Sequence, residues 1–308
     1  TPLPSSYVRH YAVGAEVVRG RERSRRPDDI LAEVRELAAS GCREVTLLGQ
    51  NVNSYGRGLG PGGDGRVWGF ADLLRAVNAL DGIARIRFTT SHPRDFSDEM
   101  IEAAASCDKV CEHFHLPLQA GSDRVLKMMN RGYTSQRYLD LVGRIRQAIP
   151  GASITTDIMV GFPGETEDDF RATLNMVSDV RFDSAFTFIY SPREGTRAAS
   201  MPDQVPEDVK RDRIYRLIEL VNATAEGVNE SLRGRVVEVM VDGPSERDAS
   251  ILAGRTRSNK MVHWRPQSGS PQGELAPGCM AMVRVVEPRT WTLHGEAADV
   301  ARKAGRVD

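Results

Sequence analysis

The chain has 308 residues, of which 40% are hydrophobic and 27% are charged, and its formal net charge is −1. This balance is that of an ordinary globular protein, and the length suits one large α/β domain followed by a small one. Because the net charge is close to zero, the overall electrostatic field of the protein does not attract nucleic acid. Any RNA binding therefore requires local basic patches. No apolar run reaches the roughly 18 residues of a membrane span, and we expect a cytoplasmic monomer without a membrane partner.

The N-terminus and the cysteines narrow the class of protein further. The opening TPLPSSYVRHYAV lacks the basic-then-apolar order of a signal peptide. The first residue is not Met, which suggests a fragment. Cys42, Cys107, Cys111 and Cys279 are too few and too scattered for a disulfide framework, so we expect reduced, buried thiols.

Helices and strands are predicted to alternate through the first two thirds of the chain. The expected helices cover 27–40, 70–80, 97–106, 122–132, 135–149 and 166–180, and the expected strands cover 44–49, 86–91, 113–118, 152–162 and 184–190. A sixth strand is expected at or before the N-terminus. This order indicates right-handed βαβ units and a parallel sheet. Because the first unit has no Gly-rich phosphate turn, a partial (βα)6 barrel is favoured over a doubly wound sheet.

The pattern changes after Pro206. A long amphipathic helix is expected over 206–232, followed by five short β-type segments at 236–243, 251–259, 261–266, 280–289 and 291–297. Glycine and proline separate these segments, and 267–278 is expected to be a loop. The pattern predicts a small all-β barrel of a kind that often holds RNA or DNA. The expected domains are therefore 1–232 and 233–300, with a tail at 301–308.

The strand ends of the larger domain carry the polar chemistry. In a parallel α/β barrel the active site is built at the C-terminal ends of the strands. The loops at these ends read GQNVNSYG, SHPRD, QAGSD, GFPGET and SPREGT. One such loop is ordinary, but five together predict a sizeable site for a polar ligand.

Several long motifs resemble those of one known family. RGRERSRRPDDILAEV, LLGQNVNSYG, FTTSHPRD, HLPLQAGSDRVLKMMNRGYT, TTDIMVGFPGETEDDF and FTFIYSPREGTRAA are similar, in this order, to motifs of the radical S-adenosylmethionine methylthiotransferases. LLGQNVNSYG resembles the branch that acts on N6-isopentenyladenosine in tRNA. The C-terminal segments, with GRTRSNKMVHW, resemble the TRAM domain of the family, a small OB-like RNA-binding barrel. The resemblance extends from Arg19 to about Val300.

The resemblance implies a radical SAM partial barrel that uses S-adenosylmethionine and a [4Fe–4S] cluster. In the family, a radical formed from S-adenosylmethionine takes a hydrogen from C2 of an isopentenylated adenosine beside the anticodon. A second cluster in a separate N-terminal domain delivers sulfur. The expected partners are the tRNA anticodon stem-loop and, for longer members, sulfur donors or iron–sulfur assembly proteins. The cofactors supply this chemistry, while the protein orients them.

Five residues are candidates for holding S-adenosylmethionine. Gln50, Gln119, Ser122 and Asp157 lie at predicted strand ends and offer donors and acceptors for a ribose and an amino-acid group. The guanidinium of Arg131 matches the geometry of a carboxylate. For Arg131 and Asp157, a structural ion pair or helix cap is an open alternative.

Four basic residues are candidates for contacting RNA: Arg193, Arg255, Arg257 and Lys260. The last three form a local cluster beside His263 and Trp264. A phosphate contact together with aromatic stacking would suit single-stranded RNA in a tRNA loop. For Trp264, a place in the barrel core is the open alternative.

The chain departs from the family at the cluster motif. The radical cluster needs Cys-x3-Cys-x2-Cys, because three irons each take one thiolate. Counted back from Arg19, the three positions hold Ser6, His10 and Val13. We therefore expect that this chain cannot hold the cluster and is inactive. Either the reading frame upstream of Arg19 is altered or cut, which the abrupt start of the match favours, or the chain is a degenerate homologue that keeps the tRNA-binding scaffold.

Other interpretations remain open. The spacing of Cys107 and Cys111, with His113 and His115 close behind, invites a zinc site, but Phe114 occupies the third position and we expect the two histidines to point to opposite faces of their strand. We therefore predict no metal site and expect both cysteines to pack on a helix-to-strand connection. The alternatives to the main hypothesis are a non-catalytic tRNA-binding homologue and a related methylthiotransferase that acts on another modified adenosine.

Overall fold

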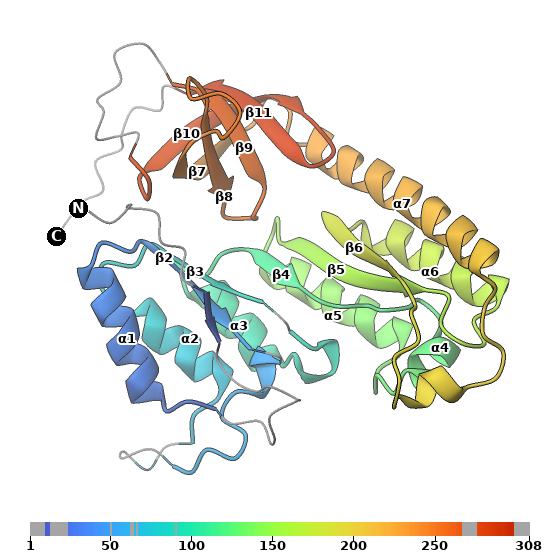
Figure 1. The fold of residues 1–308 in the computed structure, drawn as a ribbon. Helices are drawn as coiled ribbons and strands as arrows, with labels where there is room; N and C mark the ends of the chain where they lie inside the picture. Colours follow the sequence, from blue (N-terminus) through green and yellow to red (C-terminus); the bar gives the residue numbers. More distant parts are fainter. Residues whose placement is uncertain are drawn as a thin grey trace. The chain divides into compact units, whose positions relative to one another are not determined.

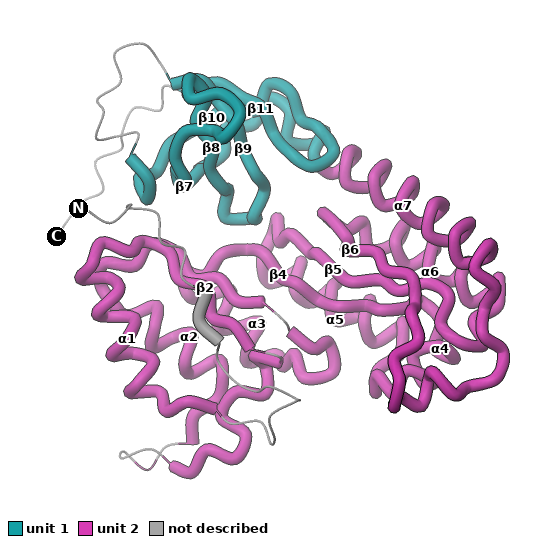
Figure 2. The backbone as a smooth tube through the Cα atoms, viewed as in Figure 1, with its two compact units in different colours: residues 1–7, 229–308 teal, residues 8–228 magenta. Residues whose placement is uncertain are grey.

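A computed structural model describes residues 10–12, 24–49, 51–61, 65, 67–89, 91–266 and 276–298. The chain divides into two compact units, residues 8–228 and residues 229–308 with 1–7, which we call the α/β unit and the barrel unit (Figure 2). The division lies near the end of the long helix α7 (Glu207–Glu230), close to the predicted boundary at 232. Among the described residues, no helix has both the length and the apolar sequence needed to cross a bilayer.

The strands of the α/β unit are parallel and follow the chain order. They are β1 (His10–Ala12), β2 (Glu44–Leu48), β3 (Arg85–Phe88), β4 (His113–His115), β5 (Ser153–Val160) and β6 (Ser184–Ile189). They form two sheets, β1-β2-β3 and β4-β5-β6, and a parallel bridge between Ile86 and Val110 connects β3 to the segment before β4. The Ile86 amide donates to the carbonyl of Lys109 at 2.7 Å. This sequential order, with β1 as the sixth strand, is the order of a partial barrel.

The helices between these strands lie where the sequence predicts them. They are α1 (Pro27–Ala39), α2 (Phe70–Asn78), α3 (Asp98–Ser106), α4 (Asp123–Met128), α5 (Ser135–Ala148) and α6 (Glu167–Val180), with short 3-10 turns η1 (Val52–Ser54), η2 (Pro93–Asp95) and η3 (Arg197–Ser200) (Figure 1). Side-chain caps set several helix starts: Ser97 accepts from the Met100 amide, and Thr166 and Asp169 form a capping box. Such caps satisfy amides that have no partner within the helix.

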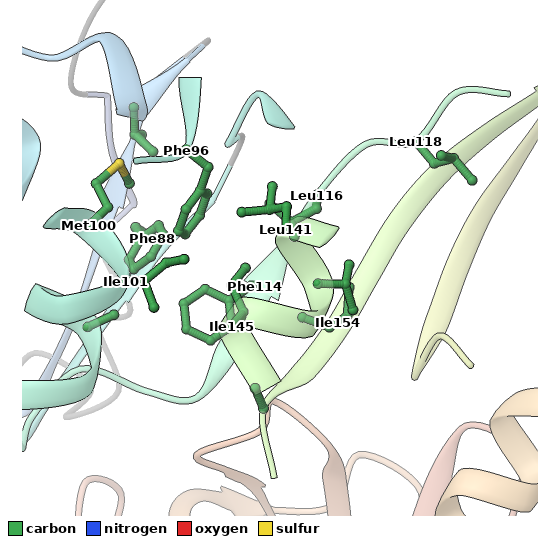
Figure 3. Packing of buried hydrophobic residues seen from close by; sticks show 14 of the residues in the cluster. Phe88, Phe96, Met100, Ile101, Phe114, Leu116, Leu118, Leu141, Ile145 and Ile154 are labelled. Carbon is green, nitrogen blue, oxygen red and sulfur yellow. The ribbon is translucent and has the colours of Figure 1, made fainter. Parts of the chain in front are cut away.

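The core of the α/β unit lies between the strands and the helices. Phe88 of β3 and Phe114 of β4 meet edge-to-face, with ring centroids 5.9 Å apart, and Phe96 packs on Phe114 at 6.1 Å (Figure 3). Ile145 of α5 and Ile154 of β5 are fully buried beside them. Side chains alternate along a strand. The residues next to these apolar ones therefore lie on the opposite, concave face of the sheet.

The barrel unit closes on itself. Its strands are β7 (Val236–Pro244), β8 (Leu252–Thr256), β9 (Met261–Arg265), β10 (Met280–Pro288) and β11 (Thr292–Ala297), in the order β10-β11-β9-β8-β7. All ladders are antiparallel except β9–β11. Eight buried apolar residues form the described hydrophobic core of the barrel: Val239, Val241, Leu252, Val262, Trp264, Val283, Val285 and Leu293. Thr256 at the end of β8 is also buried.

Trp264 corrects one expectation. Its side chain is 2% exposed and belongs to the barrel core, so it is not available to stack on RNA. The alternation along β9 explains this, since Val262 and Trp264 point inward and Met261 and His263 do not. The core alternative for Trp264 is therefore correct.

Candidate functional site

Two loops at the C-terminal ends of β2 and β3 are hydrogen-bonded to each other. The Asn51 amide donates to the Asp95 carboxylate at 2.8 Å, and the Arg57 guanidinium donates to it at 2.9 Å. The Asn53 amide donates to the carbonyl of His92 at 3.2 Å. Burial of Asp95 acts in the opposite direction, but the hydrogen bonds from Arg94, Arg57 and Asn51 lower the pKa of Asp95 to about 2.

The same rim continues to the end of β4. The ring of His92 meets Tyr133 edge-to-face at 5.5 Å, and the Tyr133 hydroxyl donates to the carbonyls of Pro117 and Leu118 at 3.0 and 2.9 Å. Burial raises the pKa of Tyr133 to about 12. Burial, followed by the charges of Arg94 and Arg131, lowers the pKa of His92. The rim loops after β2, β3 and β4 thus form one hydrogen-bonded frame.

Arg131 stands beside this frame. Its charge acts on both His92 and Tyr133, and its side chain is half-buried. In the part of the chain that the structure describes, no hydrogen bond or ion pair joins its guanidinium to a neighbour. The alternative of a structural ion pair therefore has no described partner, and the guanidinium can receive an anionic group.

Gln119 follows β4 and Asp157 lies in the second half of β5, and the backbones of the two residues are hydrogen-bonded. The Gln119 amide N–H donates to the carbonyl of Asp157, and the Gln119 carbonyl accepts from Met159, both at 2.8 Å. Gln119 has a left-handed backbone with φ of 69°, an uncommon conformation for a residue other than glycine. The Asp157 carboxylate lies 3.5 Å from Nε2 of His115. The side chains of Asp157 and His115 thus meet between two adjacent strands, beside the backbone of Gln119.

Ser122 contacts helices of the α/β unit through its hydroxyl group. Its hydroxyl caps α4 and donates to the Asp169 carboxylate at 2.5 Å, and the side chain is buried. Arg124 forms an ion pair with the same carboxylate. Ser122 therefore joins α4 to α6 in this structure.

A ladder of charged side chains on the concave face was missed in the sequence. Glu44 of β2 pairs with Arg87 of β3 at 3.0 Å, and Arg85 beside it is fully buried. In β4, both His113 and His115 contact the Thr155 hydroxyl at 3.1 Å. The alternation of polar and apolar residues in EVTLL, RIRF and HFH indicates that these polar side chains share one face of the sheet.

The shared contact of the two histidines corrects an expectation. We expected His113 and His115 to point to opposite faces, and this was wrong, because residues two apart on a strand share a face. The two cysteines before them are buried on the connection from α3 to β4, as expected. Burial raises the pKa of the Cys107 thiol. Among the described residues, no three side chains of His, Cys, Asp or Glu are arranged to hold a metal ion.

Two large apolar side chains extend the concave face at β6. Phe186 is 62% exposed and Phe188 is 48% exposed. Their strand partners in β5 are Asp157 and Met159, respectively. The Phe186 ring lies 6.3 Å from the His115 ring, edge-to-face. The polar pair of Asp157 and His115 therefore borders an exposed aromatic surface.

The GFPGET loop after β5 lines a separate cavity of about 640 Å³. Residues 201–206 and parts of α4 and α7 complete its wall. Beside it, the Arg213 guanidinium donates to the Glu165 carboxylate at 2.9 Å, and both side chains are almost fully buried. Burial raises the pKa of Glu165, although the Gly161 amide and Arg213 act in the opposite direction.

The predicted RNA-contacting residues occupy two places. Arg193 is exposed in the loop after β6. Arg255 lies on β8, 4.0 Å from the Asp242 carboxylate, and Arg257 and Lys260 lie in the turn to β9. Beyond this turn, His263 and His294 stack with ring centroids 5.4 Å apart. Burial and the neighbouring Arg247 lower the pKa of His263, and burial, Arg289 and His263 lower that of His294.

Several predicted site residues lie outside the described residues. These are Gln50, Ser6 and Val13. His10 begins the short strand β1, of which the backbone alone is described. Of the three cluster positions, none carries a cysteine.

Comparison with known families identifies the superfamily of the α/β unit. A family model described as the radical SAM superfamily matches residues 7–177. The chain belongs to the radical SAM superfamily. The fold agrees with that of coproporphyrinogen III oxidase from Escherichia coli, a radical SAM enzyme, with a TM-score of 0.50 and 12% identity over 75% of this chain and 59% of that one.

Curated relatives within the superfamily share one name. The tRNA-2-methylthio-N(6)-dimethylallyladenosine synthase of Moorella thermoacetica is 54% identical over 92% of this chain and 61% of its own length. The protein with the same name from Clostridioides difficile is 50% identical over 90% of this chain and 56% of its own length. The predicted resemblance to the methylthiotransferases is confirmed. The chain spans about three fifths of the length of these relatives.

Proposed function

We propose that this chain is the substrate-binding part of a tRNA methylthiotransferase that acts on N6-isopentenyladenosine beside the anticodon. The observation that carries the proposal is the contact of Asp157 with His115 beside Gln119, toward the C-terminal ends of β4 and β5, in a chain that is 54% identical to the Moorella relative over 92% of this chain. In a parallel barrel this edge is the one that binds ligand. The intact, hydrogen-bonded rim supports a site that keeps its binding geometry.

S-adenosylmethionine fits the donors present at this rim. Gln119 and Asp157 would hold a ribose or the amino group, and Arg131 would bind the carboxylate. We propose the barrel unit as a TRAM domain whose Arg255, Arg257 and Lys260 contact RNA phosphates. Its closed five-stranded form and its basic turn support this assignment.

The [4Fe–4S] cluster does not fit the side chains of this chain. The three positions that match the family motif hold Ser, His and Val, and the cluster needs three thiolates. We propose that the chain binds the tRNA anticodon stem-loop but does not by itself carry out the radical reaction.

Restoring the thiolates tests the part of this proposal that concerns the cluster and S-adenosylmethionine. The triple variant S6C/H10C/V13C and the wild type are reconstituted anaerobically with iron and sulfide. We expect the triple variant alone to acquire the absorbance and iron content of a [4Fe–4S] cluster and, when dithionite supplies the electron, to cleave S-adenosylmethionine to 5′-deoxyadenosine. The variant S6C/H10C/V13C/C107S/C111S is the matched control and should behave like the triple variant, because Cys107 and Cys111 are buried.

Two results would contradict the proposal. A stable cluster in the wild type would show that other residues ligate iron. A cluster in the triple variant without cleavage of S-adenosylmethionine would contradict the role proposed for Gln119, Asp157 and Arg131.

A further inference from the structure

Phe186 and Phe188 form an aromatic shelf on the concave face of the α/β unit. Both side chains are large, apolar and about half exposed or more, and they stand on the same face of β6. A single exposed apolar residue is ordinary, but adjacent ones beside a polar cluster mark a binding surface. No helix residue among those described covers this face at the two rings, since their exposure is 62% and 48%.

The neighbours of the shelf differ along its length. Phe186 stands opposite Asp157 and near the His115 ring, so hydrogen-bonding groups border it. Phe188 stands opposite the half-buried Met159, so its surroundings are apolar. Residues two apart on a strand are separated by roughly 7 Å. The shelf is therefore polar-edged at one end and apolar at the other.

This division matches a planar base with an apolar substituent. An aromatic ring stacks on any nucleobase, and an imidazole can hydrogen-bond to the edge of the base. A flexible thioether and a second ring suit a branched hydrocarbon chain. A protein–protein interface is less suitable here, because charged groups are depleted at the centre of such interfaces.

We propose that Phe186 stacks on the target adenine and that Phe188, with Met159, contacts its N6-isopentenyl group. This inference rests on the proposed function, because it takes the isopentenylated adenosine of tRNA as the ligand. It assigns to β6 the selection of modified over unmodified RNA. His115, whose ring lies beside Phe186, then hydrogen-bonds to the edge of the base.

Binding of two RNAs tests the proposal without any catalysis. The probes are fluorescein-labelled anticodon stem-loops that differ only in carrying adenosine or N6-isopentenyladenosine after the anticodon, and the readout is anisotropy. We expect the wild type to prefer the isopentenylated RNA by about tenfold, the scale of discrimination that a hydrophobic contact gives. F188A removes this preference. F186A weakens binding of both RNAs by about tenfold, as loss of one stacking contact does.

Controls separate the shelf from general effects of substitution. F186Y and F188Y keep the rings and should retain wild-type binding. Y215A removes a 65% exposed aromatic residue on α7 and should change neither affinity. Circular dichroism and the thermal midpoint check that each variant is folded.

The outcomes distinguish this inference from the proposed function. If the wild type binds both RNAs equally, or if F186A and F188A keep wild-type affinities and preference, the shelf proposal is wrong while RNA binding stands. If the wild type binds neither RNA, the proposed function fails and the shelf proposal fails with it.

Discussion

In the α/β unit, charged and polar side chains point into the concave face of the sheet, whereas the described interior of the barrel unit is built mainly from eight apolar residues, with Thr256 of β8 also buried. The strands of the first unit have one face covered by helices, so their other face is free to carry Glu44, Arg87 and Asp157. A small closed barrel has no second face to use, because its interior must be filled by side chains. Ligands are therefore expected inside the first unit and on the outer surface of the second.

The largest expected effect comes from the buried ion pair of the α/β unit. Arg213→Ala leaves Glu165 as a buried carboxylate without its guanidinium, and we expect a loss of about 3–5 kcal/mol in the free energy of unfolding. Urea denaturation followed by circular dichroism measures this loss. Arg216→Ala is the control, since this residue is 40% exposed and its ion pairs should contribute about 1 kcal/mol or less. Equal losses in the two variants would contradict the distinction between buried and exposed charge.

The barrel unit should be sensitive to apolar volume instead. Leu293→Ala removes a fully buried side chain from a core of eight residues, so we expect a loss of about 2–5 kcal/mol from the transfer of apolar surface and the cavity left behind. Trp291→Ala, at a position that is 53% exposed, should change the stability by about 0.5 kcal/mol or less. Both variants are made in a W68F background, in which the remaining tryptophans lie in the barrel unit, so denaturation followed by tryptophan fluorescence reports on the barrel. Similar losses in both variants would show that the interior does not hold the barrel together.

The smallest expected effect is a pH dependence of the barrel unit. The pKa values of His263 and His294 are lower in the fold than their ordinary value, so the unfolded chain binds more protons as the pH falls through about 6.5. Lowering the pH from about 7.5 to about 5.5 should therefore lower the thermal midpoint. In H263Q/H294Q this part of the pH dependence should disappear. An unchanged pH dependence in that variant would assign the effect to other groups.

The order of elements was predictable because it depends on local patterns. The expected strands and helices coincide with the observed ones throughout both units, since apolar periodicity and caps are properties of neighbouring residues. The place of Gln119 beside β5 also followed from the predicted parallel order of neighbouring strands. Both inferences needed no knowledge of distant contacts.

The rest depended on contacts between residues far apart in the chain. Ser122 was predicted as a ligand contact, but its hydroxyl donates to Asp169, 47 residues away. The pairing of Glu165 with Arg213 spans 48 residues and could not be predicted from either segment alone. The exposure of Phe186 and Phe188 could not be predicted either, because a strand rich in apolar residues is ordinarily expected to be buried on both faces.

The hydrogen-bonded rim has a consequence for the thermodynamics of binding. The loops after β2, β3 and β4 are already joined by Asn51, Asp95 and Tyr133. A site made of free loops must be ordered when the ligand arrives, which costs roughly 0.5–1.5 kcal/mol for each immobilised side chain. Here that ordering happens during folding, so the stability of the α/β unit and its affinity for a ligand draw on the same hydrogen bonds.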